Sequence, residues 1–336
     1  MKPWIPLTLL LSALPALALG YPEALARADD RPPVVAARAE LDDAEAQWAR
    51  TEADPAALRL ERLQARQRRE LAAAQLRLER VRASAEISLA YTQLLDAQAA
   101  YRLAERGFEL AGRTLRVARL RYVKGGIGRQ ELRASELRLE EARNRLRQAD
   151  DARALARARL FSLVGGPEPG ESLAPAGTPV LPDLEAVYRH LDAHPDLLRA
   201  AQGVELAQTA LALLDPSYAP RARIEAAQLQ LTQARTAQEE VRRGLRLQAK
   251  ARWQAVAERR RAFELARAEN DKAARDLDVA RERYRAGLIS ELALLQAELE
   301  REQAAVAVQN AEHALLAAAW ELAVATAWPL EVQDAR

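Results

Sequence analysis

Few residues of this sequence have the types and the spacing that chemistry requires. His190 and His194 are four residues apart, and on a helix this spacing would place two imidazoles on one face, as in a zinc site. The alternative is that both histidines are surface residues flanking a helix break at Pro195. His313 has no candidate partner close to it in the sequence. We favour the alternative and expect no metal site.

The segment Gly125-Gly126-Ile127-Gly128 is the second candidate, as a phosphate-binding loop. Such a loop follows a strand and ends in a Lys–Ser/Thr pair, and this segment has neither. Carboxylates are abundant, but they alternate with Arg as on solvated helix faces. No nucleophile lies beside a base. We therefore expect no catalytic residues, no cofactor and no enzyme.

The composition favours slender helices over a large globular core. The 336 residues include no Cys and only 4% aromatic residues, and small Ala side chains allow helices to approach closely. The 50 basic and 48 acidic residues give a formal charge of +2, which argues against nucleic acid as the main partner. Without Cys there is neither a disulfide nor a lipid-anchored N-terminus.

The glycine segment belongs to an internal repeat. The run Arg121-Tyr122-Val123-Lys124-Gly125-Gly126-Ile127-Gly128 returns 162 residues later as Arg283-Tyr284-Arg285-Ala286-Gly287-Leu288-Ile289-Ser290. The same offset relates leucines on both sides, from Leu103 onto Leu265 to Leu137 onto Leu299. A register sustained over some 35 residues indicates two related halves.

Each repeat motif lies within a long run that favours helix. Residues 56–166 and 221–328 contain no proline and are rich in Ala, Leu, Arg, Glu and Gln. A glycine tolerates positive φ, so each motif is a natural place for the chain to reverse. We predict a helix of roughly 100 Å, a tight turn at the motif and a helix running back. The alternative is one unbroken helix that tolerates the glycines.

Segments outside these runs carry signals of their own. Residues 1–20 are typical of a secretory signal peptide, with cleavage expected before Tyr21; an uncleaved N-terminal anchor is the alternative. We expect residues 21–33 to be irregular, 34–51 to be helical and 167–183 to form a linker between the halves. Two shorter helices are predicted after the linker, at residues 184–193 and 195–214.

The sequence therefore predicts an all-α fold, with two pseudo-repeats at about 34–166 and 184–328. Each is a long antiparallel helical hairpin, and together they form an elongated coiled-coil or α-barrel-type bundle. No segment shows the alternation of a membrane strand, so no β-barrel is expected. After residue 20 no uncharged apolar run reaches the length of a membrane helix.

Several motifs resemble those of TolC-type outer membrane efflux proteins. Two tandem halves with Arg-Tyr-x-x-Gly between long antiparallel helices are typical of that family, and the second copy, followed by Leu294-Leu295-Gln296-Ala297, is the closer match. In the first copy Gly126 and Gly128 replace larger residues. Further landmarks are His194-Pro195-Asp196-Leu197 and Tyr218-Ala219-Pro220. The resemblance covers about residues 34–328.

This resemblance implies a function and a set of contact residues. In that family three chains form a periplasmic helical tunnel topped by an outer-membrane β-barrel, and the helix–turn–helix tips meet a periplasmic adaptor that joins an inner-membrane pump. The implied partners here are further copies of this chain, an adaptor and a pump, in the periplasm or cell envelope. The implied adaptor-facing residues are Arg121, Tyr122, Gly125, Ile127, Gly128, Arg283, Tyr284, Gly287, Leu288, Ile289 and Ser290.

One departure from the family bears on its membrane role. The family inserts a strand pair between paired helices in each half, and here the two places, near residues 54–55 and 218–221, are too short for strands. We expect the tunnel without the barrel, with indirect membrane association. The alternatives are a structural coiled-coil envelope protein that lost transport, or a soluble enzyme or binding protein. The apolar residues Ile127, Leu288 and Ile289 either bind a partner or pack the turns.

Overall fold

The computed structural model describes residues 19–165, 173, 175–180, 182–215 and 217–333. Residues 1–18 of the expected signal peptide and residues 167–172, 174 and 181 of the expected linker lie outside these residues. The elements are α1 Tyr21–Ala26, η1 Arg27–Asp30, α2 Pro32–Ala53, α3 Arg59–Val123, α4 Arg129–Val164, β1 Thr178–Pro179, α5 Leu184–His190, η2 Leu191–Ala193, α6 Pro195–Ala212, α7 Arg221–Arg285, α8 Glu291–Thr326 and β2 Val332–Gln333.

The four longest helices repeat with the offset of the sequence motif. Helices α3 and α7 have 65 residues each, and α4 and α8 have 36 residues each. Both ends of α3 and of α4 lie 162 residues before the corresponding ends of α7 and α8. The prediction of an all-α fold built from long antiparallel hairpins is confirmed.

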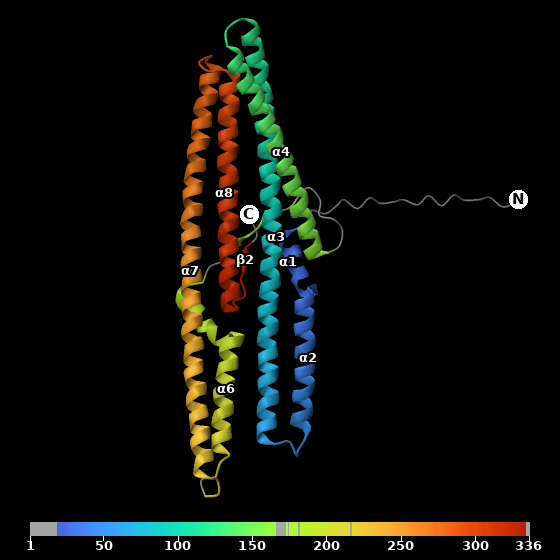
Figure 1. Ribbon diagram of the computed structural model, residues 1–336, viewed down its shortest axis with the longest axis vertical. Helices are drawn as coiled ribbons and strands as arrows, with labels where there is room; N and C mark the ends of the chain where they lie inside the picture. Colours follow the sequence, from blue (N-terminus) through green and yellow to red (C-terminus); the bar gives the residue numbers. More distant parts are fainter. Residues whose placement is uncertain (1–18, 166–172, 174, 181, 216, 334–336) are drawn as a thin grey trace, which may run out of the picture.

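The helices lie side by side in an elongated molecule (Figure 1). In the half that carries the glycine turns, the packing order is α4, α3, α8 and α7; in the other half it is α2, α3, α6 and α7. Helices α3 and α7 therefore run through both halves. The two glycine turns lie at one end of the molecule, and the α2–α3 and α6–α7 connections lie at the other (Figure 1). The described residues of those connections, 54–58 and 213–220, form no strand.

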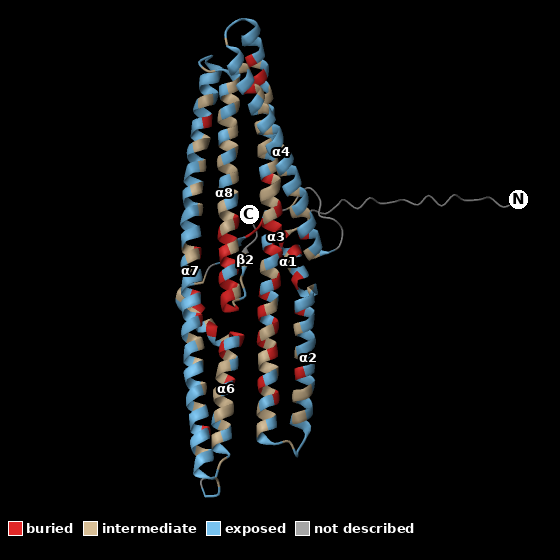
Figure 2. Cartoon of the chain, in the orientation of Figure 1, coloured by how far each residue is buried: buried red, intermediate tan, exposed pale blue. Residues whose placement is uncertain are grey.

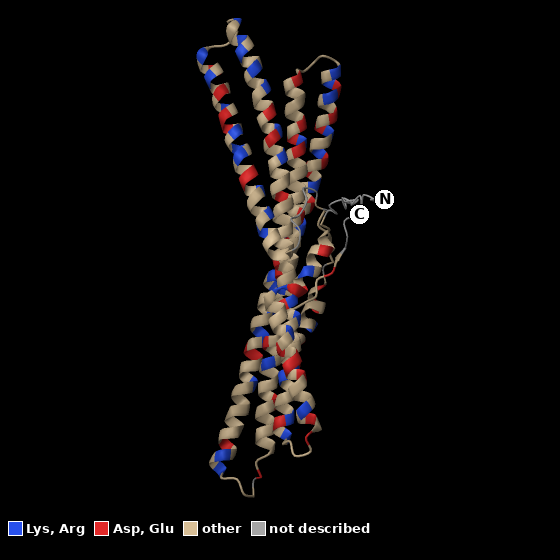
Figure 3. Cartoon of the chain, turned by 90° about the vertical axis from the view of Figure 1, so that its right-hand side faces the viewer, with Lys and Arg blue, Asp and Glu red and all other residues tan. Residues whose placement is uncertain are grey.

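The buried residues gather in the middle of the molecule (Figure 2). One apolar cluster joins α1, α3 and the C-terminal part of α8, with Ile87, Tyr91 and Trp320 at its centre. A second cluster joins α5, α6, α7 and α8 around Leu191 and Val256. Towards the ends, charged residues of both signs follow one another along the helices (Figure 3).

The expectation that residues 21–33 are irregular is wrong. They form α1, η1 and the start of α2. The prolines that suggested a break lie in the first turns of α1 and α2, where proline is accepted because the N–H groups there have no intrahelical acceptor. Tyr21 then packs into the central cluster and holds α1 in place.

The expectation that the chain lacks strands is nearly right. Strands β1 and β2 have two residues each and pair antiparallel, Thr178 with Gln333 and Pro179 with Val332. Ordered structure therefore continues past residue 328, where the second pseudo-repeat was expected to end. In the described part of the chain no helix combines the length and the apolar character needed to cross a membrane.

Candidate partner-binding tips

The first tip is a tight reversal built by backbone hydrogen bonds. Gly125 has φ +71°, and its N–H donates to the Tyr122 carbonyl at 3.0 Å. The N–H of Gly126 donates to the Arg121 carbonyl at 2.8 Å. These are the two bonds of a Schellman motif, which ends a helix with a left-handed residue and is favoured by glycine. The chain therefore reverses here, as predicted, and the alternative of one unbroken helix is wrong at this motif.

The second tip repeats this geometry. Gly287 has φ +71° and donates to the Tyr284 carbonyl at 2.9 Å, while Leu288 N–H donates to the Arg283 carbonyl at 2.8 Å. The shared Arg-Tyr-x-x-Gly motif therefore supplies the carbonyl acceptors and the left-handed glycine. The tips differ at the start of the next helix, because Ser290 Oγ accepts from Ala293 N–H at 3.3 Å and Gly128 has no side chain to do so.

Each tip presents apolar side chains to solvent at the end of the molecule. Leu288 is 73% exposed, whereas Ile127 and Ile289 are half-buried. The most exposed apolar residue of the first tip is Val123, at 83%, and Leu120, one turn before it, is also exposed. The sequence analysis missed these two residues, because Val123 aligns with the charged Arg285 of the second copy.

The first tip carries a concentrated positive charge, and the second does not. Residues 113–133 contain seven Arg or Lys and one carboxylate, Glu131, whereas the equivalent residues 275–295 contain four of each sign. Five exposed cations form no ion pair with any described residue. They are Arg116, Arg119, Arg121, Lys124 and Arg129. The two tips are alike in backbone and different in charge.

Side chains tie the two hairpins together below the tips. Arg113 on α3 donates to Glu291 on α8 at 2.7 Å, one turn after the second reversal. Nearer the middle, the imidazole Nδ1 of His313 on α8 lies 2.6 Å from a carboxylate oxygen of Asp96 on α3. These contacts join α8 to α3 at two levels below the tips.

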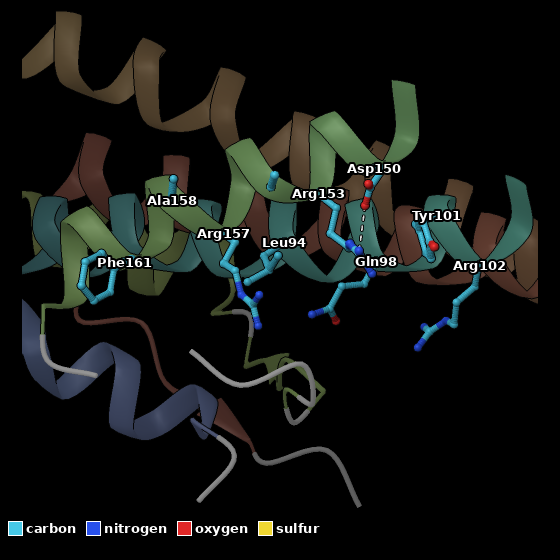
Figure 4. Close-up of a pocket in the computed structure, with 10 residues that line it drawn as sticks. Leu94, Gln98, Tyr101, Arg102, Asp150, Arg153, Arg157, Ala158 and Phe161 are labelled. Atoms are coloured by element: carbon cyan, nitrogen blue, oxygen red, sulfur yellow. Dashed lines mark hydrogen bonds and ion pairs between the residues drawn. The ribbon is translucent and has the colours of Figure 1, made fainter. Parts of the chain in front are cut away.

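A groove lies between α3 and α4 in the first hairpin (Figure 4). It has a volume of about 580 Å³. Arg153 on α4 lies in it, donates to Asp150 at 2.7 Å and places its guanidinium 4.0 Å from the centre of the Tyr101 ring on α3. Arg153 therefore holds α4 against α3, and its charge is already engaged by a carboxylate and an aromatic face.

The histidines that were considered as metal ligands serve the fold. His190 Nε2 lies 3.0 Å from the Ala327 carbonyl, and its ring meets that of Trp328 edge to face. His194 is 5% exposed, so its expected surface position is wrong. Its Nδ1 accepts from the Asp196 N–H and caps α6. The described residues contain no group of three or more His, Cys, Asp or Glu placed to hold a metal ion.

Comparisons with known proteins agree with this arrangement. No family model and no curated protein matches the chain. Solved structures do match, among them the Campylobacter jejuni CmeC outer membrane channel, with 13% identity, a TM-score of 0.64 and coverage of 92% of this chain and 85% of that one. The chain has the TolC-type fold.

Two further structures with the TolC-type fold support this assignment. The Neisseria gonorrhoeae MtrE outer membrane channel, solved in its open state, matches with 16% identity, a TM-score of 0.62 and coverage of 91% and 88%. CusC, described in terms of folding and transmembrane channel formation, matches with 16% identity, a TM-score of 0.66 and coverage of 91% and 95%. The likeness at this identity concerns the fold, and it agrees with the family resemblance of the sequence motifs.

Proposed function

We propose that this chain is a TolC-like component of an envelope efflux or secretion system. It forms a periplasmic helical tunnel as a homo-oligomer, a trimer by family resemblance, and docks a periplasmic adaptor through its two tips. The adaptor in turn connects the tunnel to an inner-membrane pump. The observation that carries this proposal is the pair of matched reversals at one end of the molecule, each presenting apolar side chains to solvent.

The outer helices support self-association. In the described chain α4 packs chiefly on α3, and α7 packs on α8 and α6, so one long face of each remains without a neighbour. Helix α4 buries only Ser135 and Leu160. Exposed apolar residues recur on both outer helices: Leu137, Leu155 and Phe161 on α4, and Leu229, Leu247, Leu265 and Val279 on α7. Exposed apolar residues on opposite edges suit a ring in which α4 of one copy meets α7 of the next.

The charge of the first tip supports docking to an acidic surface. Five exposed cations without ion-pair partners attract carboxylates, and this attraction weakens as salt rises. The second tip has balanced charge and offers Leu288 instead. We therefore assign adaptor attraction mainly to the first tip and apolar contact to both.

The test is adaptor binding by variants that change a tip without changing the fold. Leu288→Asp and Val123→Asp replace exposed side chains, so the free energy of unfolding should change by less than about 0.5 kcal/mol. Both variants should lose copurification with a periplasmic adaptor that is coexpressed with the chain and that the wild type retains. Leu58→Asp is the matched control, because Leu58 is 65% exposed at the opposite end. Normal adaptor binding by well-folded tip variants would refute docking through the tips.

A further inference from the structure

Two residues ahead of α1 are part of the folded body. The Tyr91 hydroxyl donates to the Leu19 carbonyl at 3.0 Å, and the Leu19 side chain packs against the central apolar cluster. The Gly20 carbonyl accepts from Ala24 N–H at 3.0 Å, which closes the first turn of α1. The Gly20 N–H donates to the Glu23 carboxylate at 3.1 Å. These residues therefore contribute contacts that the mature protein would lose without them.

The helix that follows joins the two repeats. The Tyr21 hydroxyl lies 2.8 Å from Ser88 Oγ on α3 and accepts from the indole N–H of Trp320 on α8 at 3.2 Å. Its ring meets Tyr91 on α3 edge to face, with centroids 5.2 Å apart. Tyr21 is 2% exposed. Because α1 lies against both α3 and α8, the start of the mature chain affects the junction of the repeats.

We propose that a signal peptidase cleaves this chain between Ala18 and Leu19. Ala16 and Ala18 place small residues at the third and first positions before this bond, the A-x-A pattern that the enzyme recognises. Water supplies a hydroxyl group to the Ala18 carboxyl and a proton to the Leu19 amine, so the peptide bond is hydrolysed with no other reactant.

The bond before Tyr21, which the sequence analysis favoured, is the competing site. It is preceded by Ala18 and Gly20, which are also small, so sequence alone does not separate the two sites. The contacts of the folded chain favour the bond after Ala18. A cut before Tyr21 removes the Leu19 carbonyl that accepts from the buried Tyr91 hydroxyl, and removes the Gly20 carbonyl and N–H that cap α1. A cut after Ala18 keeps all three interactions.

The experiment is expression of the full chain with its own leader in a Gram-negative host. Intact mass and N-terminal sequencing of the exported protein should give a chain that begins Leu19-Gly20-Tyr21. Ala18→Leu places a large side chain next to the proposed bond and should leave the precursor uncleaved. Gly20→Leu, which alters the competing site, should still give a chain that begins at Leu19.

Other outcomes would overturn the proposal. These are a chain that begins at Tyr21, a wild-type precursor that stays uncleaved, or a block by Gly20→Leu with normal processing of Ala18→Leu. A second measurement compares purified chains that begin at Leu19 and at Tyr21. The shorter chain should melt lower by about 2 °C or more, because it lacks the bonds of Leu19 and Gly20. Equal melting temperatures would remove the packing argument.

Discussion

Gly125 and Gly287 show why the tips could be located from single residues. Both adopt φ +71°, which is costly for any residue with a Cβ. A Cβ built on either glycine would meet no atom within 4 Å, so the requirement comes from the backbone alone. A glycine in a helical run can therefore mark a position that needs positive φ. Because the glycine returns after 162 residues, the sequence predicted the positions of both turns.

The first prediction compares Gly287, in the turn after α7, with Gly244, inside α7. Gly287→Ala should lower the free energy of unfolding by about 1 kcal/mol through backbone strain. Gly244→Ala, in the interior of α7, should raise it by roughly 0.5–1 kcal/mol, because alanine favours helix and the site has space for a methyl group. Chemical denaturation of the two variants measures both effects. Changes of the same sign would contradict the assigned turn.

The second prediction concerns His194 and pH. Burial lowers the pKa of His194 below its usual value, and this effect outweighs the attraction of Asp196 for a proton. The unfolded chain therefore binds this proton more readily than the folded chain, so stability is full above about pH 6.5 and falls as pH drops through the folded pKa. His194→Asn keeps a side chain that can cap α6 but does not titrate. Its melting temperature should fall less between pH 7 and 5 than that of the wild type; equal falls would contradict the assignment.

The residue type alone did not predict burial or exposure where the surrounding structure determines it. His194 lies beside a proline in sequence and looks like a surface residue, but long-range packing buries it. The equivalent of Val123 in the second copy is the charged Arg285, so the repeat gave no signal for an apolar residue there. Its 83% exposure follows only from the geometry of the reversal.

At the scale of elements, the long helices and the two shorter helices after the linker, α5 with η2 and α6, were predictable, whereas α1 was not. The runs 56–166 and 221–328 lack proline and favour helix throughout, so their helices begin and end close to the predicted residues. Helix α1 has six residues and could not be stable alone. It exists because Tyr21 packs between α3 and α8, a contact between residues 299 positions apart in sequence.

The third prediction tests how α1 is held. Tyr21→Phe should cost about 1–3 kcal/mol, because Trp320 N–H is left without its buried acceptor and Ser88 loses a partner. Tyr21→Ala should cost about 3–5 kcal/mol through the cavity it leaves. Limited proteolysis should cut within residues 21–31 faster in Tyr21→Ala than in the wild type. Equal cutting rates would show that this side chain does not hold α1.

At the scale of the whole molecule, a single chain is an open layer of helices with two free edges. The repeat predicted two equivalent hairpins, and the structure places α4 and α7 at the edges. The sequence could not show that α4 and α7 form the edges. That result depends on which helix of the first hairpin packs against which helix of the second. Here α3 and α8 meet, and the ion pair of Arg113 with Glu291 and the contact of Asp96 with His313 join them.

The fourth prediction is that the edges hold the oligomer together. Leu155→Asp on α4 and Leu265→Asp on α7 place charges on exposed apolar residues, so helicity should stay unchanged. Each should reduce a trimer to smaller species in light scattering. Leu58→Asp, at the end opposite the tips, should remain trimeric. A monomeric wild type, or trimers in both edge variants, would contradict a ring closed by α4 and α7.

Site-specific crosslinking is the most direct test of the central claim that the glycine turns dock an adaptor. A photocrosslinking amino acid is placed at Ser290 in the second tip, or at Ser217 in the α6–α7 connection at the opposite end; both serines are exposed. With a periplasmic adaptor coexpressed in the same cells, the account predicts an adaptor adduct from Ser290 and none from Ser217. An adduct from Ser217 alone, or from neither position, would contradict docking through the tips.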